Sequence, residues 1–118
     1  MQVSAFLRST ADTLVTTELV LAEADYLILD RLGSDAEALF VRDLAEGTYL
    51  STCLSQSDLG DAQDLLERYA DLKLGLADAS VVVAARNFET RRVLTLDHRA
   101  FQAVSPLQGG AFELLPAP

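Results

Sequence analysis

The chain has 118 residues, half of them apolar, and a formal net charge of −9. This length suits one compact domain over residues 1–118, with a core that needs no disulfide. The single cysteine, Cys53, allows no internal disulfide and is expected in the core, and no secretory signal is evident, which together favour the cytoplasm. The excess of acids argues against binding nucleic acid by charge alone, and no apolar run is long enough to predict a membrane span.

In chain order, the pattern first predicts the tail of a helix over residues 1–10 and a short strand over 14–16. A helix is predicted over 18–31, and its apolar residues fall on nearly every side, which is typical of a buried helix. Gly33 ends it. Ser34 and Glu37 then form a capping box for a helix over 35–46.

The second half of the chain continues the alternation of strands and helices. Its predicted elements are a strand over 48–52, a helix from Ser57 to about Tyr69, a nearly all-apolar helix over 76–88, a strand over 92–96, a turn or short helix over 97–103 and a strand over 111–115. Such alternation predicts an α/β fold around a mostly parallel sheet.

Three acids stand where burial would favour apolar side chains. Glu23 lies among leucines on the helix over 18–31, and it either binds a cation, has a partner, turns neutral or simply faces water. Asp78 opens an apolar helix, where the helix dipole alone would favour it. Asp97 follows a strand directly, so it either caps the next turn or lies where open α/β sheets bind ligands. Together they would suit Mg²⁺ or Mn²⁺, but their convergence does not follow from the sequence.

Other polar residues have ordinary explanations beside functional ones. His98 adjoins Asp97 and could contact a phosphate, although an exposed turn residue is the simpler interpretation. The arginines of the last third could hold RNA or form a solvated face; they are Arg86, Arg91, Arg92 and Arg99.

Several segments together are similar to one known family. The segments 19–23 (LVLAE), 75–80 (GLADAS) and 95–101 (TLDHRAF), with 31–37, 67–72 and 109–112, resemble in order and spacing the PIN-domain ribonucleases of the VapC toxin type. The resemblance covers almost the whole chain.

This resemblance implies a PIN-like three-layer α/β/α sandwich with a mostly parallel sheet. It implies that Glu23, Asp78 and Asp97 are catalytic residues that hold Mg²⁺ (or Mn²⁺) for the hydrolysis of RNA, and that Thr95 orients water. It also implies a type II toxin that a VapB-type antitoxin neutralises, and a homodimer.

The start of the chain departs from the family pattern, which opens with a buried strand ending in an acid. No such strand precedes Leu14, and Asp12 is interpreted as loop. We therefore expect the first, central strand and the first acid to be missing, which would leave two strand edges unpaired. A misplaced start at Met1 or a truncated gene would explain this departure.

Two alternatives follow. A catalytically impaired remnant would act only as an antitoxin-binding module. A receiver-like signalling domain is disfavoured because the only lysine, Lys73, lies in a predicted loop before a helix.

Overall fold

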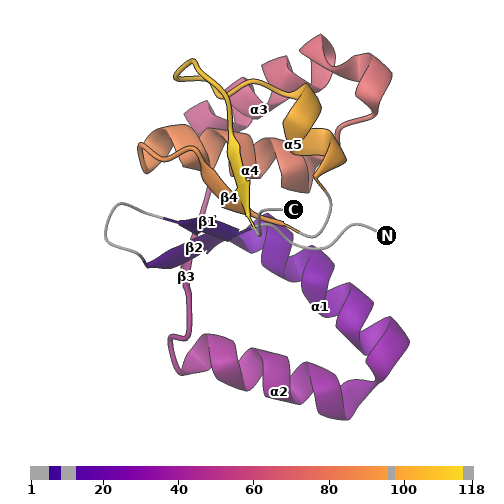
Figure 1. Cartoon of the computed structure of the whole chain (residues 1–118). Coiled ribbons are helices and arrows are strands. Elements are labelled where there is room, and N and C mark those ends of the chain that lie inside the picture. The colour runs from indigo at the N-terminus through magenta and orange to yellow at the C-terminus, as the bar shows by residue number, and fades with distance from the viewer. Residues whose placement is uncertain (1–5, 9–12, 96–97, 116–118) are drawn as a thin grey trace.

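The structure, a computed structural model, describes residues 6–8, 13–95 and 98–115. Within these ranges, one sheet of five strands has the order β3-β2-β1-β4-β5 (Figure 1). β2 pairs with β3 and β4 with β5 in parallel, whereas β1 is antiparallel to both of its neighbours. The α/β class and the mostly parallel sheet are therefore confirmed. The strands are β1 (Phe6–Arg8), β2 (Leu14–Thr17), β3 (Leu50–Thr52), β4 (Arg92–Leu94) and β5 (Glu113–Leu115).

The central position of the sheet is filled by β1, so the expectation of an empty central position was wrong, whereas the absence of the family's first acid stays a prediction. β1 lies between β2 and β4, and its residue Leu7 pairs with Val15 on one side and Val93 on the other. The prediction of a helix tail over residues 1–10 was also wrong for the described part, residues 6–8. Because β1 satisfies the backbone groups of both neighbours, the two strand edges expected to be unpaired have a partner.

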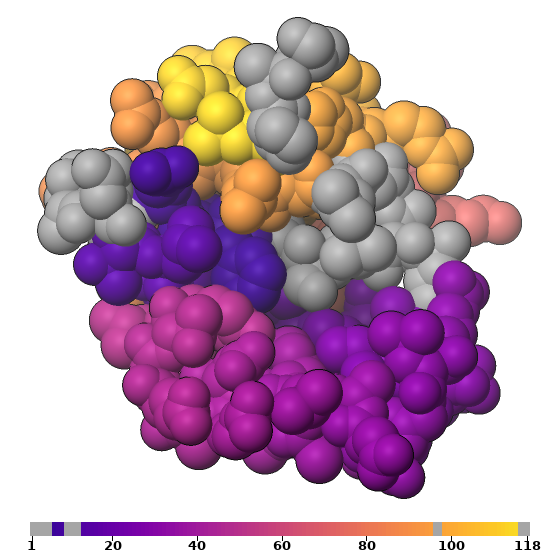
Figure 2. All heavy atoms as spheres, turned by 60° about the horizontal axis from the view of Figure 1, so that its bottom comes forward, coloured from indigo at the N-terminus to yellow at the C-terminus, as the bar shows by residue number. Residues whose placement is uncertain are grey.

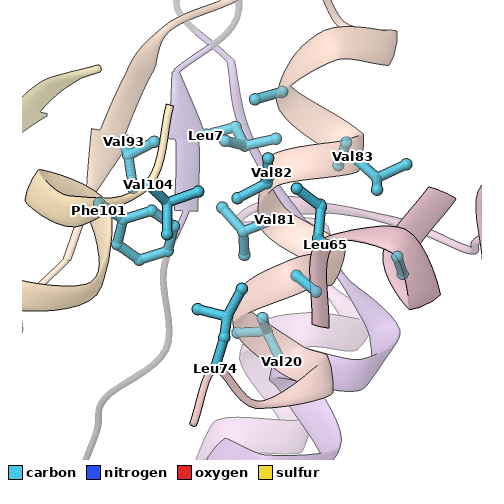
Figure 3. Close-up of a cluster of buried hydrophobic side chains, with 14 of the residues drawn as sticks. Leu7, Val20, Leu65, Leu74, Val81, Val82, Val83, Val93, Phe101 and Val104 are labelled. Carbon is cyan, nitrogen blue, oxygen red and sulfur yellow. The ribbon is translucent and has the colours of Figure 1, made fainter. Parts of the chain in front are cut away.

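α4 (Leu76–Asn87) is the central helix of the core. Every residue from Ala79 to Ala85 is buried, as its apolar sequence predicts. Figure 3 shows Val81 and Val82 together with Leu7 of β1, and their cluster continues to Val93, Phe101 and Val104. α3 (Gln56–Arg68) packs on α4. Along the chain, a short 3₁₀ turn, Ala70–Leu72, follows α3, and α5 (Arg99–Ala103) follows β4.

A capping box fixes the N-terminus of α3, which begins at Gln56, one residue before the predicted start at Ser57. The Ser55 hydroxyl accepts from the N–H of Asp58, and the Asp58 carboxylate accepts from the N–H of Ser55, at 3.0 Å each. Arg86 of α4 donates to Asp61 at 2.8 Å and to Asp58 at 3.4 Å. The start of α3 is thereby tied to the end of α4.

α1 (Glu18–Leu32) and α2 (Ser34–Ala45) form a hairpin that extends away from the sheet on the side opposite α3 (Figure 1). The expectation that the first helix is mostly buried was wrong, because only Val20 and Ala24 of α1 are buried. α2 has no buried residue. Two short apolar-rich helices therefore share a face that the described part of the chain leaves open.

The turn between these helices depends on glycine. Gly33 has a φ of 93°, which side chains disfavour, and its N–H closes α1 onto the carbonyls of Ile28 and Leu29. The capping box predicted at Ser34 is absent, since Ser34 is the first helical residue and Gly33 holds the cap position. None of the helices in the described ranges is long and apolar enough to cross a membrane.

Candidate functional site

The four parallel strands end at one edge of the sheet, and the candidate residues lie at this carboxyl edge. Leu7 pairs with both Val15 and Val93, so β2 and β4 are in register across β1. Thr17 and Thr95, each two residues further along, therefore lie level and on the face that α4 covers. Both are buried, and the Thr95 N–H extends the pairing to β5 through the carbonyl of Leu115 at 2.9 Å.

A pair of buried hydroxyls joins β2 to the first turns of α4. Thr17 Oγ1 lies 2.7 Å from Ser80 Oγ, and Ser80 Oγ also lies 2.6 Å from the carbonyl oxygen of Ala77. Thr17 Oγ1 in addition accepts from the N–H of Val20 at 3.2 Å and so caps α1. One threonine thus fixes the start of α1 against the start of α4.

Asp78 lies in the first turn of α4, two residues before Ser80, and it is half-buried. The helix begins after Gly75, whose lack of a side chain leaves its N-terminus without a side-chain cap. A carboxylate at this position is stabilised by the exposed N–H groups and the dipole of the helix. The structure therefore holds Asp78 at the carboxyl edge with its surroundings fixed by the Thr17–Ser80 pair.

Glu23 lies on α1, the helix that Thr17 caps. Val20 and Ala24 are the buried residues of α1, which packs on α4. Glu23 follows Val20 by three residues and so lies one turn further along nearly the same side of the helix. Glu23 is exposed, so its expected burial among leucines was wrong, and its role as a cation ligand stays a prediction. Glu23 and Asp78 thus stand on two helices that contact each other.

Asp97 lies outside the described residues, so the convergence of the three acids stays a prediction. In the ranges that are described, no group of three His, Cys, Asp or Glu side chains is arranged to hold a metal ion. The donors that Glu23, Asp78, Thr17 and Ser80 offer are carboxylate and hydroxyl oxygens. Such a donor set fits hard cations such as Mg²⁺ and Mn²⁺ and does not suit soft metals.

Three of the four arginines of the last third have partners other than Glu23 and Asp78. Arg86 is paired with Asp58 and Asp61. Arg91 donates to the carbonyl of Gly109 at 2.7 Å, and Arg92 forms an ion pair with Glu113 at 3.1 Å.

With Arg8, the residues Arg91 and Arg92 line a pocket of about 470 Å³ at the amino end of β4. Whether the arginines of the last third hold RNA or form a solvated face stays open, and three of them have acidic or carbonyl partners within the chain. Arg99 begins α5 and His98, half-buried, precedes it.

Cys53 is exposed, so its expected place in the core was wrong. It lies just beyond the carboxyl end of β3 beside Glu18. The hydrogen bond to Glu18 is the main cause that raises the pKa of the Cys53 thiol, and desolvation and the Glu18 charge act in the same direction. The sequence offered no pattern that predicts this pair, because the two residues are brought together only by the parallel pairing of β2 with β3.

The comparison with known proteins agrees with the geometry. No protein-family model matches the chain. The chain is 40% identical over 114 residues to "Ribonuclease VapC26" of Mycobacterium tuberculosis, an alignment that covers 97% of this chain and 84% of that protein. With the mostly parallel α/β sheet and the acids at its carboxyl edge, this identity shows that the chain belongs to the VapC-type PIN-domain ribonuclease family.

Proposed function

We propose that this chain is a metal-dependent endoribonuclease, the toxin of a toxin–antitoxin pair, which hydrolyses phosphodiester bonds of RNA in the cytoplasm. The observation that carries the proposal is the 40% identity, across nearly the whole chain, to a protein named as a ribonuclease. The contact of α1 with α4, which carry Glu23 and Asp78, supports the same conclusion.

Mg²⁺ or Mn²⁺ would be held by Asp78 and Glu23, with Asp97 as the third acid on the basis of the family resemblance. When bound, such an ion lowers the pKa of a coordinated water and offsets charge on the phosphoryl group. The residues of the chain orient this site: the Thr17–Ser80 pair holds the first turns of α4 against β2, and Thr95 directly follows β4 on the same face. We propose that Thr95 orients the attacking water.

The metal also addresses the objection raised by the net charge of −9. A chain with this charge repels a polyanion at long range. Carboxylates gathered at one edge would attract divalent ions there, and those ions would offer the phosphate backbone a local positive charge.

Cleavage of single-stranded RNA by the purified chain tests this proposal. We expect cleavage with Mg²⁺ or Mn²⁺, none with a chelator, and a loss of at least about a hundredfold in Asp78→Asn. Asp64→Asn is the matched control, because Asp64 is exposed on α3 and distant in sequence from the site. Cleavage that persists in the chelator, or that Asp78→Asn leaves unchanged, would contradict the proposal.

The partner surface that we propose for a VapB-type antitoxin is the open face of the α1–α2 hairpin. Its large apolar side chains include Tyr26, 65% exposed, and Leu32, 71% exposed. Leu29 of α1 and Leu39 and Val41 of α2 are exposed as well, and α1 and α2 form much of the face seen in Figure 2. Exposed apolar groups at this density favour a protein partner.

A second candidate is the remnant that binds antitoxin without catalysis, and the same open hairpin favours it. The two candidates differ in one assay. The enzyme cleaves RNA and loses that cleavage when antitoxin is added, whereas the remnant binds antitoxin but cleaves nothing. Leu32→Ser should weaken antitoxin binding in either case and leave any cleavage intact. We also propose that the chain forms a homodimer, which sedimentation of the chain alone would test.

A further inference from the structure

A pocket opens at the carboxyl edge of the sheet, and neither Glu23 nor Asp78 lines it. This pocket has a volume of about 210 Å³ and lies between the ends of β2 and β3 and the starts of α1 and α3. One of its lining residues is Thr17, whose hydroxyl contacts Ser80 in α4. The side chain of Thr17 therefore contacts both the pocket and α4, the helix that carries Asp78.

The walls of this pocket have two kinds of chemistry. Leu19, Leu54 and Leu59 give it an apolar side, and Leu59 is 44% exposed. Glu18 and Thr52 bring oxygen atoms, and Cys53 brings its thiol. Glu18 lies close enough to Cys53 to be the main cause that raises the pKa of that thiol, so the carboxylate and the thiol face the same pocket.

An apolar wall with a carboxylate at its edge suits a flat ring that carries N–H donors. Single-stranded RNA is recognised in this way, since its bases leave the stack, pack on side chains and present their Watson–Crick edges. A pocket of this size, smaller than the usual cavity for a drug-sized ligand, accepts one base.

The base that fits a carboxylate best is guanine. Its N1–H and its 2-amino group point in the same direction and match the two oxygens of one carboxylate. Adenine and cytosine each place an acceptor nitrogen beside their amino group, and uracil flanks its N–H with two carbonyls. Each of these edges sets an acceptor against one of the Glu18 oxygens.

We infer that Glu18 and the pocket between β2 and β3 form a specificity site that selects a guanine next to the scissile bond. This inference rests on the proposed ribonuclease function and deepens it. Glu18 acts on the choice of substrate and takes no part in the hydrolysis. Glu18 is exposed, so water competes for its carboxylate and the selectivity should be moderate.

The experiment uses a set of short single-stranded RNAs that differ at one base, carrying guanine, 7-deazaguanine, inosine or adenine. We expect the RNAs with guanine and 7-deazaguanine to be cleaved at equal rates, about tenfold faster than the RNA with adenine. The RNA with inosine should be cleaved at a rate between those of the guanine and adenine RNAs, because inosine lacks the 2-amino group. Glu18→Gln should reduce the preference for guanine to about twofold or less while the adenine RNA is cleaved as before. Glu46→Gln, at an exposed glutamate that ends α2 and does not line the pocket, is the control.

A second readout uses the single cysteine of the chain, which lies in the pocket. In the Asp78→Asn protein, in which we expect cleavage to be at least about a hundredfold slower, guanine-containing RNA should slow the labelling of Cys53 by N-ethylmaleimide at least about threefold, and the adenine RNA should not. Equal cleavage of all four RNAs, with no protection of Cys53, would overturn the guanine site and leave the ribonuclease standing. If no RNA is cleaved by the unmodified chain, the proposed function fails and this inference fails with it.

Discussion

The hydroxyl of Thr17 lies 2.7 Å from the hydroxyl of Ser80, although 63 residues separate the two in the chain. This contact joins the end of β2 to the start of α4 inside the core, where neither group can reach water. The same threonine caps α1 through the N–H of Val20. The helices that carry Glu23 and Asp78 are thus positioned by one residue.

Replacing Thr17 with valine should cost about 1–3 kcal/mol of unfolding free energy. The change removes the cap of α1 and leaves the Ser80 hydroxyl with one partner fewer. Urea unfolding followed by circular dichroism measures the loss. Thr17→Ser keeps the oxygen and should recover most of the stability; a Thr17→Val protein as stable as the parent would show that the contact does not hold the site.

The sequence predicted most of the fold because most elements are encoded locally. The apolar run of α4 predicts a buried helix, and β2 and β4 are short apolar strands that the structure confirms. β4 ends at Leu94, earlier than residue 96. β1 was missed because three residues, Phe6 to Arg8, carry too little pattern, and their pairing depends entirely on β2 and β4.

Leu7→Ala tests whether β1 is an integral part of the core. Leu7 is fully buried and packs with Val82 and Val93 in the central cluster, so the cavity left behind should cost about 2–5 kcal/mol. Leu29→Ala, at a residue 43% exposed on α1, should change stability by no more than about 0.5 kcal/mol. Chemical denaturation of both proteins gives the comparison. Equal effects of the two changes would contradict the central place of β1.

The pH dependence of stability should depend on Asp58. The hydrogen bond from the N–H of Ser55 is the main cause that holds the pKa of Asp58 below its ordinary value of 3.8, and Asn87, the Ser55 side chain and Arg86 add to it, against desolvation. Since the folded-state pKa is the lower one, the stabilisation is fully present above about pH 4 and is lost as the pH falls through the folded pKa.

Asp58→Asn should therefore cost about 1 kcal/mol near pH 7 and progressively less below pH 4. Urea unfolding at a series of pH values measures the difference from the parent. Asp64→Asn, at an exposed residue of the same helix, is the control and should show no such trend. A constant difference from pH 7 to pH 2 would be inconsistent with the lowered pKa.

The site was only partly predictable. Asp78 stood out because an acid in an apolar helix is unusual, and the structure puts it, half-buried, at the carboxyl edge. Glu23 was predicted among buried leucines, but α1 turns only one narrow side to α4, so Glu23 is exposed. Thr17 was passed over because a threonine at the end of a strand is ordinary. Its role arises from a tertiary contact with Ser80, which a local pattern does not encode.

The most direct test of the account is the binding of Mn²⁺ to the purified chain, measured by calorimetry without RNA. If Glu23 and Asp78 share one ion, Glu23→Gln and Asp78→Asn should each weaken Mn²⁺ binding by at least about tenfold, and the double variant should lose less than the sum of the two effects. Glu46→Gln should bind as the parent does. Unchanged Mn²⁺ affinity in both single variants would contradict the shared metal site and with it the proposed mechanism.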